Sequence, residues 1–179
     1  YIGGGRPNAV TATVSRIDDS NDTTITSTRG QLSSARDNLR GSGNINFGWF
    51  SGCRQPVPLQ TLVDRVDYSN DNATASIRGP LSSARSYAAT TGNFDYGYSG
   101  GDYGNTIVDR IDYSNDIVRA NIRGPLSTGR GKHGATGNSS FGWFGGGNLA
   151  FGSSGPNSTI DRINYANDTT TALIRGAFT

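Results

Sequence analysis

The residues that most often support catalysis, metal binding and disulfide formation are scarce in this sequence. Its 179 residues include one cysteine, one histidine and no methionine. The single cysteine, Cys53, excludes an intrachain disulfide and a cysteine-based zinc site, and we expect it to be a small packing residue. His133 lies in the glycine-flanked segment 131–134, which we expect to be an exposed loop, and no serine-based nucleophile elbow accompanies it. We therefore predict no catalytic residue, no metal site and no cofactor.

Long hydrophobic runs and a strong charge of either sign are also missing. No apolar run approaches the roughly 18–20 residues of a membrane helix, so we expect no membrane insertion. The formal net charge is +2, which gives no basic field for nucleic acid as a main partner. The chain starts at Tyr1 and lacks methionine, so we interpret it as part of a longer or processed protein whose localisation is not marked at this terminus.

Glycine and small polar residues take the place of helix formers. The sequence has 26 glycines and is 33% hydrophobic, and its β-branched and aromatic residues recur in short clusters. This composition is typical of short strands joined by tight turns. We therefore predict an all-β fold.

Four tandem repeats account for the whole chain. Arginines at 16, 65, 110 and 162 are separated by steps of 49, 45 and 52 residues, and the Arg-Gly pairs that begin at 29, 78, 123 and 175 follow the same steps. The interval between the two landmarks is thus 13 residues in every copy, and the length variation lies elsewhere. We divide the chain into repeats 1–46, 47–93, 94–138 and 139–179, the last one truncated, which together form one propeller-type domain or a fragment of one.

Each repeat is predicted to contain about four short antiparallel strands. In the second copy, residues 61–68 alternate between two faces, Ser69-Asn70-Asp71 is a turn, and a return strand ends before Gly79-Pro80. The aromatic strand of each copy runs into glycines, as in Phe141-Gly-Trp-Phe144. We predict strands near 13–18, 62–68, 107–113 and 159–165, and no helix longer than a turn or two.

The order of these landmarks resembles the kelch repeat, which folds as one blade of a β-propeller. The resemblance lies in a small-residue strand after an arginine (83–92), an aromatic strand ending in Gly-Gly (96–101) and a strand ending in tyrosine (108–113). The sequence departs from the kelch pattern in three places. The kelch tryptophan is missing near Ala75 and Ala120, the Gly-Gly of the second copy is replaced at 51–53, and Asp19 stands where the other copies have tyrosine.

Longer phrases resemble repeats in predicted proteins of marine cyanophages and related aquatic viruses. The phrases are DRIDYSND, IRGPLSSAR and ATGNSSFGWFGGG. That resemblance implies a role on a virion or tail, in a virion or extracellular location.

Asp-Arg pairs in the second, third and fourth copies, at 64–65, 109–110 and 161–162, are the most regular charged feature. Adjacent residues of a strand face opposite sides, so Asp64 and Arg65 are not expected to pair with each other. We expect the arginine of each copy to bond a carboxylate or carbonyl of the neighbouring repeat; a ring of ligand-reading arginines is the alternative. The structural landmarks of the repeats are therefore Arg16, Arg65, Arg110, Arg162, Tyr68, Tyr113 and Tyr165.

Two other motifs have structural as well as functional interpretations. Trp49 and Trp143 are expected to fill the core, with stacking on a sugar as the alternative. The oxygens of Asp67-x-Ser69-x-Asp71 are spaced as in some calcium loops, but the glycine and the distant acid of such loops are missing, so we expect a turn.

Specificity is expected at the segments whose length varies between copies, which are 54–60, 102–105 and 148–158. These segments join the aromatic strand to the Asp-Arg strand, at one edge of every repeat. Our candidate binding residues there are Asp102, Tyr103, Asn105, Asn148 and Phe151.

The favoured function is a non-catalytic structural or adhesive module of a virion tail, fibre or other extracellular assembly. Its partners would be protein subunits of the same assembly, in a possible homo-oligomer, or a surface glycan. An intracellular kelch-type adaptor and a carbohydrate-active enzyme are the alternatives.

Overall fold

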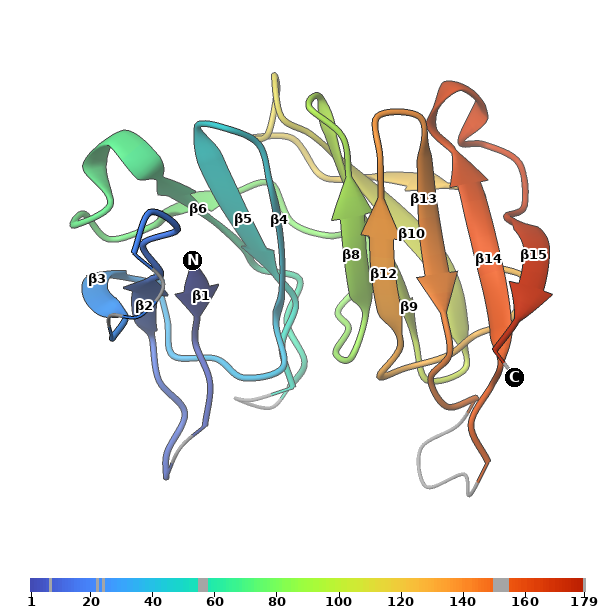
Figure 1. Ribbon diagram of the computed structural model, residues 1–179, viewed down its shortest axis with the longest axis horizontal. Coiled ribbons are helices and arrows are strands. Elements are labelled where there is room, and N and C mark those ends of the chain that lie inside the picture. The colour runs from blue at the N-terminus through green and yellow to red at the C-terminus, as the bar shows by residue number, and fades with distance from the viewer. Residues whose placement is uncertain (7, 22, 24, 55–57, 150–154, 179) are drawn as a thin grey trace.

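The chain folds into four antiparallel sheets that follow one another along the sequence (Figure 1). The structure is a computed structural model that describes residues 1–179 except 7, 22, 24, 55–57, 150–154 and 179. Among the described residues the only helical segments are the single 3₁₀ turns η1 (Tyr68–Asn70) and η2 (Tyr165–Asn167). The predicted all-β fold is confirmed.

We number the sheets 1 to 4 in chain order. Sheet 1 contains β1 (Ile2–Gly3), β2 (Thr13–Arg16) and β3 (Ser27–Gln31). Sheet 2 contains β4 (Arg40–Gly43), β5 (Phe47–Ser51), β6 (Val63–Asp67) and β7 (Ser76–Arg78). Sheet 3 contains β8 (Ala89–Gly92), β9 (Tyr96–Asp102), β10 (Asn105–Asp112) and β11 (Asn121–Arg123). Sheet 4 contains β12 (Gly134–Gly137), β13 (Phe141–Gly145), β14 (Thr159–Asn164) and β15 (Leu173–Ala177).

The strands form where alternation and turn chemistry predict them. The third strand of each four-stranded sheet carries the Asp-Arg pair, and it ends at a residue whose side chain caps the following turn. In sheet 2, for example, the carboxylate of Asp67 accepts the backbone N–H of Ser69 at 2.9 Å and its hydroxyl at 2.7 Å. These bonds lower the pKa of Asp67 and use its carboxylate as an internal turn cap, as the sequence predicts.

The sheets are offset by one strand from the repeats aligned in the sequence. The small-residue strand that closes each sequence repeat, such as β4, pairs with the aromatic strand of the next repeat and becomes the first strand of its sheet. Each four-stranded sheet therefore contains residues from two sequence repeats, and the chain itself links neighbouring sheets covalently.

The sheets stack face to face in an open series. The first strands β4, β8 and β12 contact one another from sheet to sheet, and the Thr90 hydroxyl donates to the Gly41 carbonyl at 2.5 Å. Sheets 1 and 4 lie at opposite ends of the longest axis of the molecule (Figure 1). The arrangement is compatible with a propeller-like one, and these four sheets do not close a ring.

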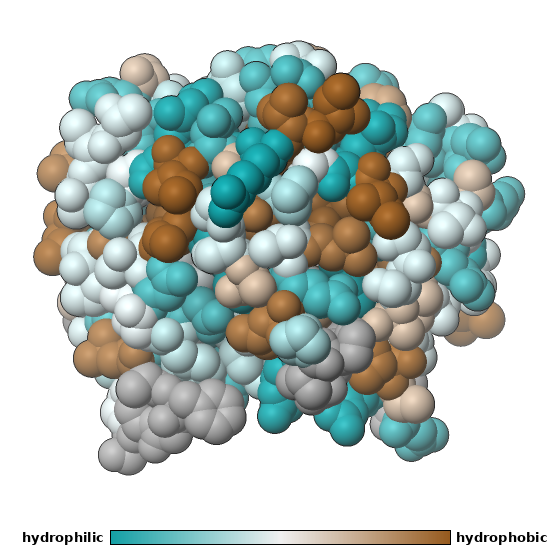
Figure 2. All heavy atoms as spheres, turned by 180° about the vertical axis from the view of Figure 1, so that it is seen from behind, coloured by the Kyte–Doolittle hydropathy of each residue, from teal (hydrophilic) through white to brown (hydrophobic). Residues whose placement is uncertain are grey.

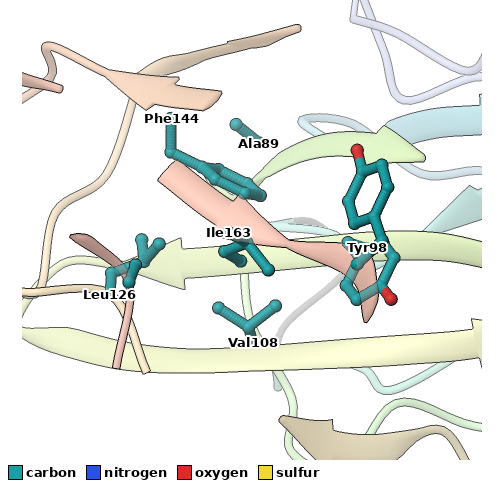
Figure 3. Close-up of a cluster of buried hydrophobic side chains, with 8 residues drawn as sticks. Ala89, Tyr98, Val108, Leu126, Phe144 and Ile163 are labelled. Atoms are coloured by element: carbon teal, nitrogen blue, oxygen red, sulfur yellow. The ribbon is translucent and has the colours of Figure 1, made fainter. Parts of the chain in front are cut away.

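Each pair of neighbouring sheets encloses its own hydrophobic cluster. Val14, Leu32, Phe50 and Val66 pack between sheets 1 and 2, and Trp49, Val63, Leu81 and Ile111 pack between sheets 2 and 3. The cluster between sheets 3 and 4 includes Tyr98, Val108, Leu126, Phe144 and Ile163 (Figure 3). The core is thus divided into three layers, each made by two sheets.

Seen from behind, the surface shows separate hydrophobic patches among hydrophilic residues (Figure 2).

Glycine at the end of the last strand lets the next sheet approach. A Cβ at Gly124 would lie 1.8 Å from the carbonyl oxygen of Thr170 in sheet 4, and Gly79 is equally close to Val118 in sheet 3. The amide of Gly124 donates to the Asp168 carbonyl at 2.7 Å. The Arg-Gly landmark of the sequence therefore marks a contact of backbone against backbone.

We expect Gly124→Ala to destabilise the protein by about 1–3 kcal/mol, because the added methyl group forces the backbones of sheets 3 and 4 apart. The matched control is Gly134→Ala in β12, where a Cβ would meet nothing within 4 Å. Urea unfolding measures both variants. A Gly124→Ala variant as stable as Gly134→Ala would contradict the close approach.

Candidate binding surface

In sheets 2 and 3 the two residues of the Asp-Arg pair bond to opposite neighbours. In sheet 2, Asp64 accepts from Arg36 on the connection that arrives from sheet 1, whereas Arg65 donates to Asp116 of sheet 3. Adjacent residues of a strand point to opposite faces, so a single dipeptide reaches the structure on both sides of its sheet. This alternation explains why the two charges recur together.

The first of these contacts is completely buried. Arg36–Asp64 and Arg85–Asp109 are joined at 2.6 and 2.7 Å, Arg130 pairs with Asp161 in the same way, and all six side chains are 0% exposed. The same carboxylate also accepts a backbone N–H, as Asp109 does from Ser82 at 2.9 Å. The second guanidinium nitrogen of the arginine donates to a carbonyl, that of Ile107 in the case of Arg85. Several hydrogen bonds thus offset the desolvation of each buried charge.

The second contact gathers donors from the preceding sheet around one carboxylate in the Asn-Asp turn. Asp168 accepts from the Tyr98 hydroxyl and from Arg110, both at 2.8 Å, and forms an ion pair with Arg123 at 3.3 Å. Asp116 accepts a hydrogen bond from Trp49 and forms ion pairs with Arg65 and Arg78, all of sheet 2. Asp71 interacts in the same way with Tyr1, Arg16 and Arg29 of sheet 1. Burial and the bond to Asp168 raise the pKa of Tyr98, so its hydroxyl stays protonated and donates.

Stacked aromatic rings complete the contact between neighbouring sheets. Tyr98 stacks on Tyr165 with ring centroids 4.7 Å apart, and Trp49 stacks on Tyr113 at 3.9 Å. Tyr1 stacks on Tyr68 in the same way at 4.5 Å. Each tyrosine landmark therefore packs against the aromatic strand of the sheet before it.

The copies in sheet 4 carry the same residues without these partners. Arg162 lies over the Phe141 ring, but it bonds no carboxylate among the described residues. Trp49 is buried as expected, whereas Trp143 is partly exposed, so its assignment to the core is wrong. The physical reason is that no sheet covers this face of sheet 4 in the described part of the chain.

We expect Arg110→Ala to lower the free energy of unfolding by about 1–3 kcal/mol, because Asp168 then loses a charged donor in a mostly buried site. Arg162→Ala removes the same residue type from the same repeat position and should cost less than about 0.5 kcal/mol. Thermal and urea unfolding compare the two. Equal losses for both variants would rule out the contact between sheets as the source of the effect.

Four of the five candidate loop residues anchor their own loops. Asp102 accepts the Ser86 amide at 3.1 Å, and Asn105 accepts the Ile107 amide at 2.8 Å. Tyr103 packs edge-on against Tyr87, and Asn148 pairs with Gly131 through two backbone hydrogen bonds. Phe151 lies outside the described residues. The loop of sheet 3 also touches that of sheet 4, since the Gly104 amide donates to the Leu149 carbonyl at 3.1 Å.

Both edges of the sheets carry exposed apolar residues. At the loop edge, a hollow of about 420 Å³ is lined by Leu59, Leu62, Ile77 and Pro80 among others. At the opposite edge, Ile45 and Phe94 at the tips of the first turns are 77% and 67% exposed. The sequence analysis did not predict these exposed apolar residues. The signal that could have found them is that this one position of an otherwise regular turn holds three different residues, Ile45, Phe94 and Ser139.

His133 is buried, and the prediction of an exposed loop is wrong. Its side chain is 6% exposed and fills the space next to Gly101 and Gly147, where an added Cβ would lie within 3 Å of it. The corresponding residue immediately before the first strand of sheet 2 is Leu39, which contacts Gly4 in the same manner. Burial, reinforced by the nearby positive charges of Arg130 and Arg40, lowers the pKa of His133 to about 4.

The low pKa of His133 makes stability dependent on pH. The unfolded chain binds a proton at this residue below about pH 6.5, whereas the folded chain does not until about pH 4, so stability falls as the pH drops through that interval. We expect His133→Leu, which reproduces the Leu39 contact, to remove up to about 3 kcal/mol of this loss. Urea unfolding of the parent and the variant at several pH values measures the difference, and parallel curves would contradict it.

No protein-family model matches the chain, and no curated protein matches it. The described residues contain no group of three or more histidine, cysteine, aspartate or glutamate side chains placed to hold a metal ion. In the same residues, no helix has the length and apolar character needed to cross a membrane.

Proposed function

We propose that the chain is a non-catalytic structural or adhesive module, part of a kelch-like β-propeller, that binds protein or glycan through its loop edge. The observation that carries the proposal is that the residues kept in the repeats and the segments that vary in length lie in different places. Apart from those on the uncovered face of sheet 4, the arginines, aspartates and aromatic residues that recur in the copies are engaged in contacts between sheets. The residues that differ in number lie between the second and third strands, at the loop edge.

A rigid series of sheets with a variable edge suits recognition. The buried pairs and stacked rings fix the distance between neighbouring loops, so several loops meet a partner without further ordering, which reduces the entropic cost of binding. The hollow beside Leu59 and Leu62 adds apolar area at the same edge. Repeated sheets also engage a repeated partner at several points, which suits the tail or fibre of a virion or another extracellular assembly.

A loop chimera tests the proposal. Segments 54–60 and 148–158 are both replaced by the shorter turn 102–105, and binding is compared on an immobilised glycan array and with a displayed library of protein fragments. We expect the free energy of unfolding of the chimera to stay within about 1 kcal/mol of that of the parent. Its affinity for the partner should fall at least tenfold.

The matched control changes the opposite edge. Ile45→Ser and Phe94→Ser together copy the residue found at Ser139 and should leave binding unchanged. A folded chimera that binds as well as the parent, or a control that loses binding while the chimera keeps it, would overturn the assignment to the loop edge.

A further inference from the structure

The outer face of sheet 4 has the same composition as the faces that are covered elsewhere in the protein. Sheets 1, 2 and 3 each present an aromatic ring, a valine and a leucine to the sheet that follows them. In sheet 3 these residues are Tyr98, Val108 and Leu126, whose exposed fractions are 0%, 0% and 1%. In sheet 4 the corresponding residues are Trp143, Ile160 and Phe178, and they line an open hollow of about 440 Å³.

Exposure separates this face from its three counterparts. Phe178 occupies the backbone position of Leu126, because its amide donates to the Ser158 carbonyl at 2.8 Å as that of Leu126 donates to Thr106 at 2.9 Å. Phe178 is nevertheless 58% exposed, whereas the three leucines are 1% or 2% exposed. Trp143 and Ile160 are also partly exposed.

The polar donors of this face are likewise in place and unused. Arg162 and Arg175 occupy the positions from which Arg110 and Arg123 reach Asp168. Arg175 is exposed, and neither Arg162 nor Arg175 forms an ion pair with a carboxylate among the described residues, whereas Arg110 and Arg123 both do. A Cβ at Gly176 would meet nothing within 4 Å, whereas the matching Gly124 is pressed against sheet 4.

We propose that this face of sheet 4, defined by Trp143, Ile160, Arg162, Arg175 and Phe178, is a docking surface for a further repeat of the same type. The occupant presents a tyrosine, which stacks on Trp143, and three residues later an aspartate, which accepts from the Trp143 Nε1–H and both arginines. Asp116 serves Trp49, Arg65 and Arg78 in this manner, with Tyr113 as the stacked ring. The two positive charges without a carboxylate make an acidic turn the complementary partner.

Sheet 1 of a second copy fits this surface poorly. It has Asp19 at the position of the stacking tyrosine, and Ser15 where the other sheets have the aspartate that pairs with the arginine of the connection. An aspartate facing the indole replaces a stacked aromatic pair by a carboxylate that loses its hydration. The occupant is therefore a repeat that carries the stacking tyrosine, as sheets 2, 3 and 4 do.

The experiment adds one repeat to the intact chain. A copy of residues 82–124 is placed after Phe178, which thereby keeps the position that Leu81 has in the natural sequence. The background carries Trp49→Tyr so that Trp143 is the only tryptophan; the buried Tyr98 shows that tyrosine fits the corresponding position of sheet 3. We expect the added repeat to reduce acrylamide quenching of Trp143 several-fold and to raise the unfolding temperature of the whole chain in one transition.

The matched control carries Tyr113→Asp and Asp116→Ala in the added copy, which imitates Asp19 and removes the acceptor. Its Trp143 should be quenched as strongly as in the chain without the addition. An unmodified extension that leaves Trp143 equally exposed, or that melts separately, would overturn the proposal.

Sedimentation of the original chain addresses the other occupant. A monomer at all concentrations agrees with the mismatch of sheet 1. Self-association that is abolished by either Trp143→Ala or Ile17→Asp would identify a second copy as the occupant and overturn the proposal.

Discussion

The alternation of an aspartate and an arginine along one strand is the constraint on which the arrangement of the sheets depends. The strand places the carboxylate of Asp109 on one face, toward Arg85, and the guanidinium of Arg110 on the other, toward Asp168. Sheets 2 and 3 are therefore each tied to the structure before them and to the sheet after them. A buried ion pair adds little to stability when compared with apolar residues, but an unpaired buried charge is costly, so we infer that these pairs disfavour other registers between sheets more than they add to stability.

The hydrophobic layers follow from this arrangement. Short strands with few large side chains bury limited apolar area. Each hydrophobic cluster therefore needs two sheets, because neither sheet alone could shield it from water. Glycines such as Gly124 allow the sheets to approach until their backbones touch, which brings Tyr98 and Tyr165 into stacking distance. Loops at the edge take no part in these layers, so their length varies without disturbing them.

Sequence patterns predicted the local structure well because strand alternation and turn capping depend on neighbours in the chain. The sequence predicted that the repeat arginines bond a neighbouring repeat, but it did not identify the acceptor, because partners such as Tyr98 and Asp168 are 70 positions apart. Asp71 is an example. Its position in a Ser-Asn-Asp turn gave a sufficient local reason for an aspartate there, so its role as the acceptor for Tyr1 and Arg16 was missed. Arg85 was missed for the opposite reason, since it lies in a connection, where arginines are usually exposed.

The buried aspartate and the stacking tyrosine are both replaced in the first copy, and this joint replacement indicates what the two residues do in the other copies. Every copy with the buried aspartate also follows an arginine connection, and the copy with Ser15 lacks the stacking tyrosine as well. Both replacements affect the face of sheet 1 that no sheet covers, where Ile2 and Ile17 are also exposed. A residue type that is kept wherever a neighbour is present, and lost where none is, serves the contact and not the strand. By the same reasoning the unpartnered face of sheet 4, which keeps Trp143, Arg162 and Arg175, has the residues of a face that is covered.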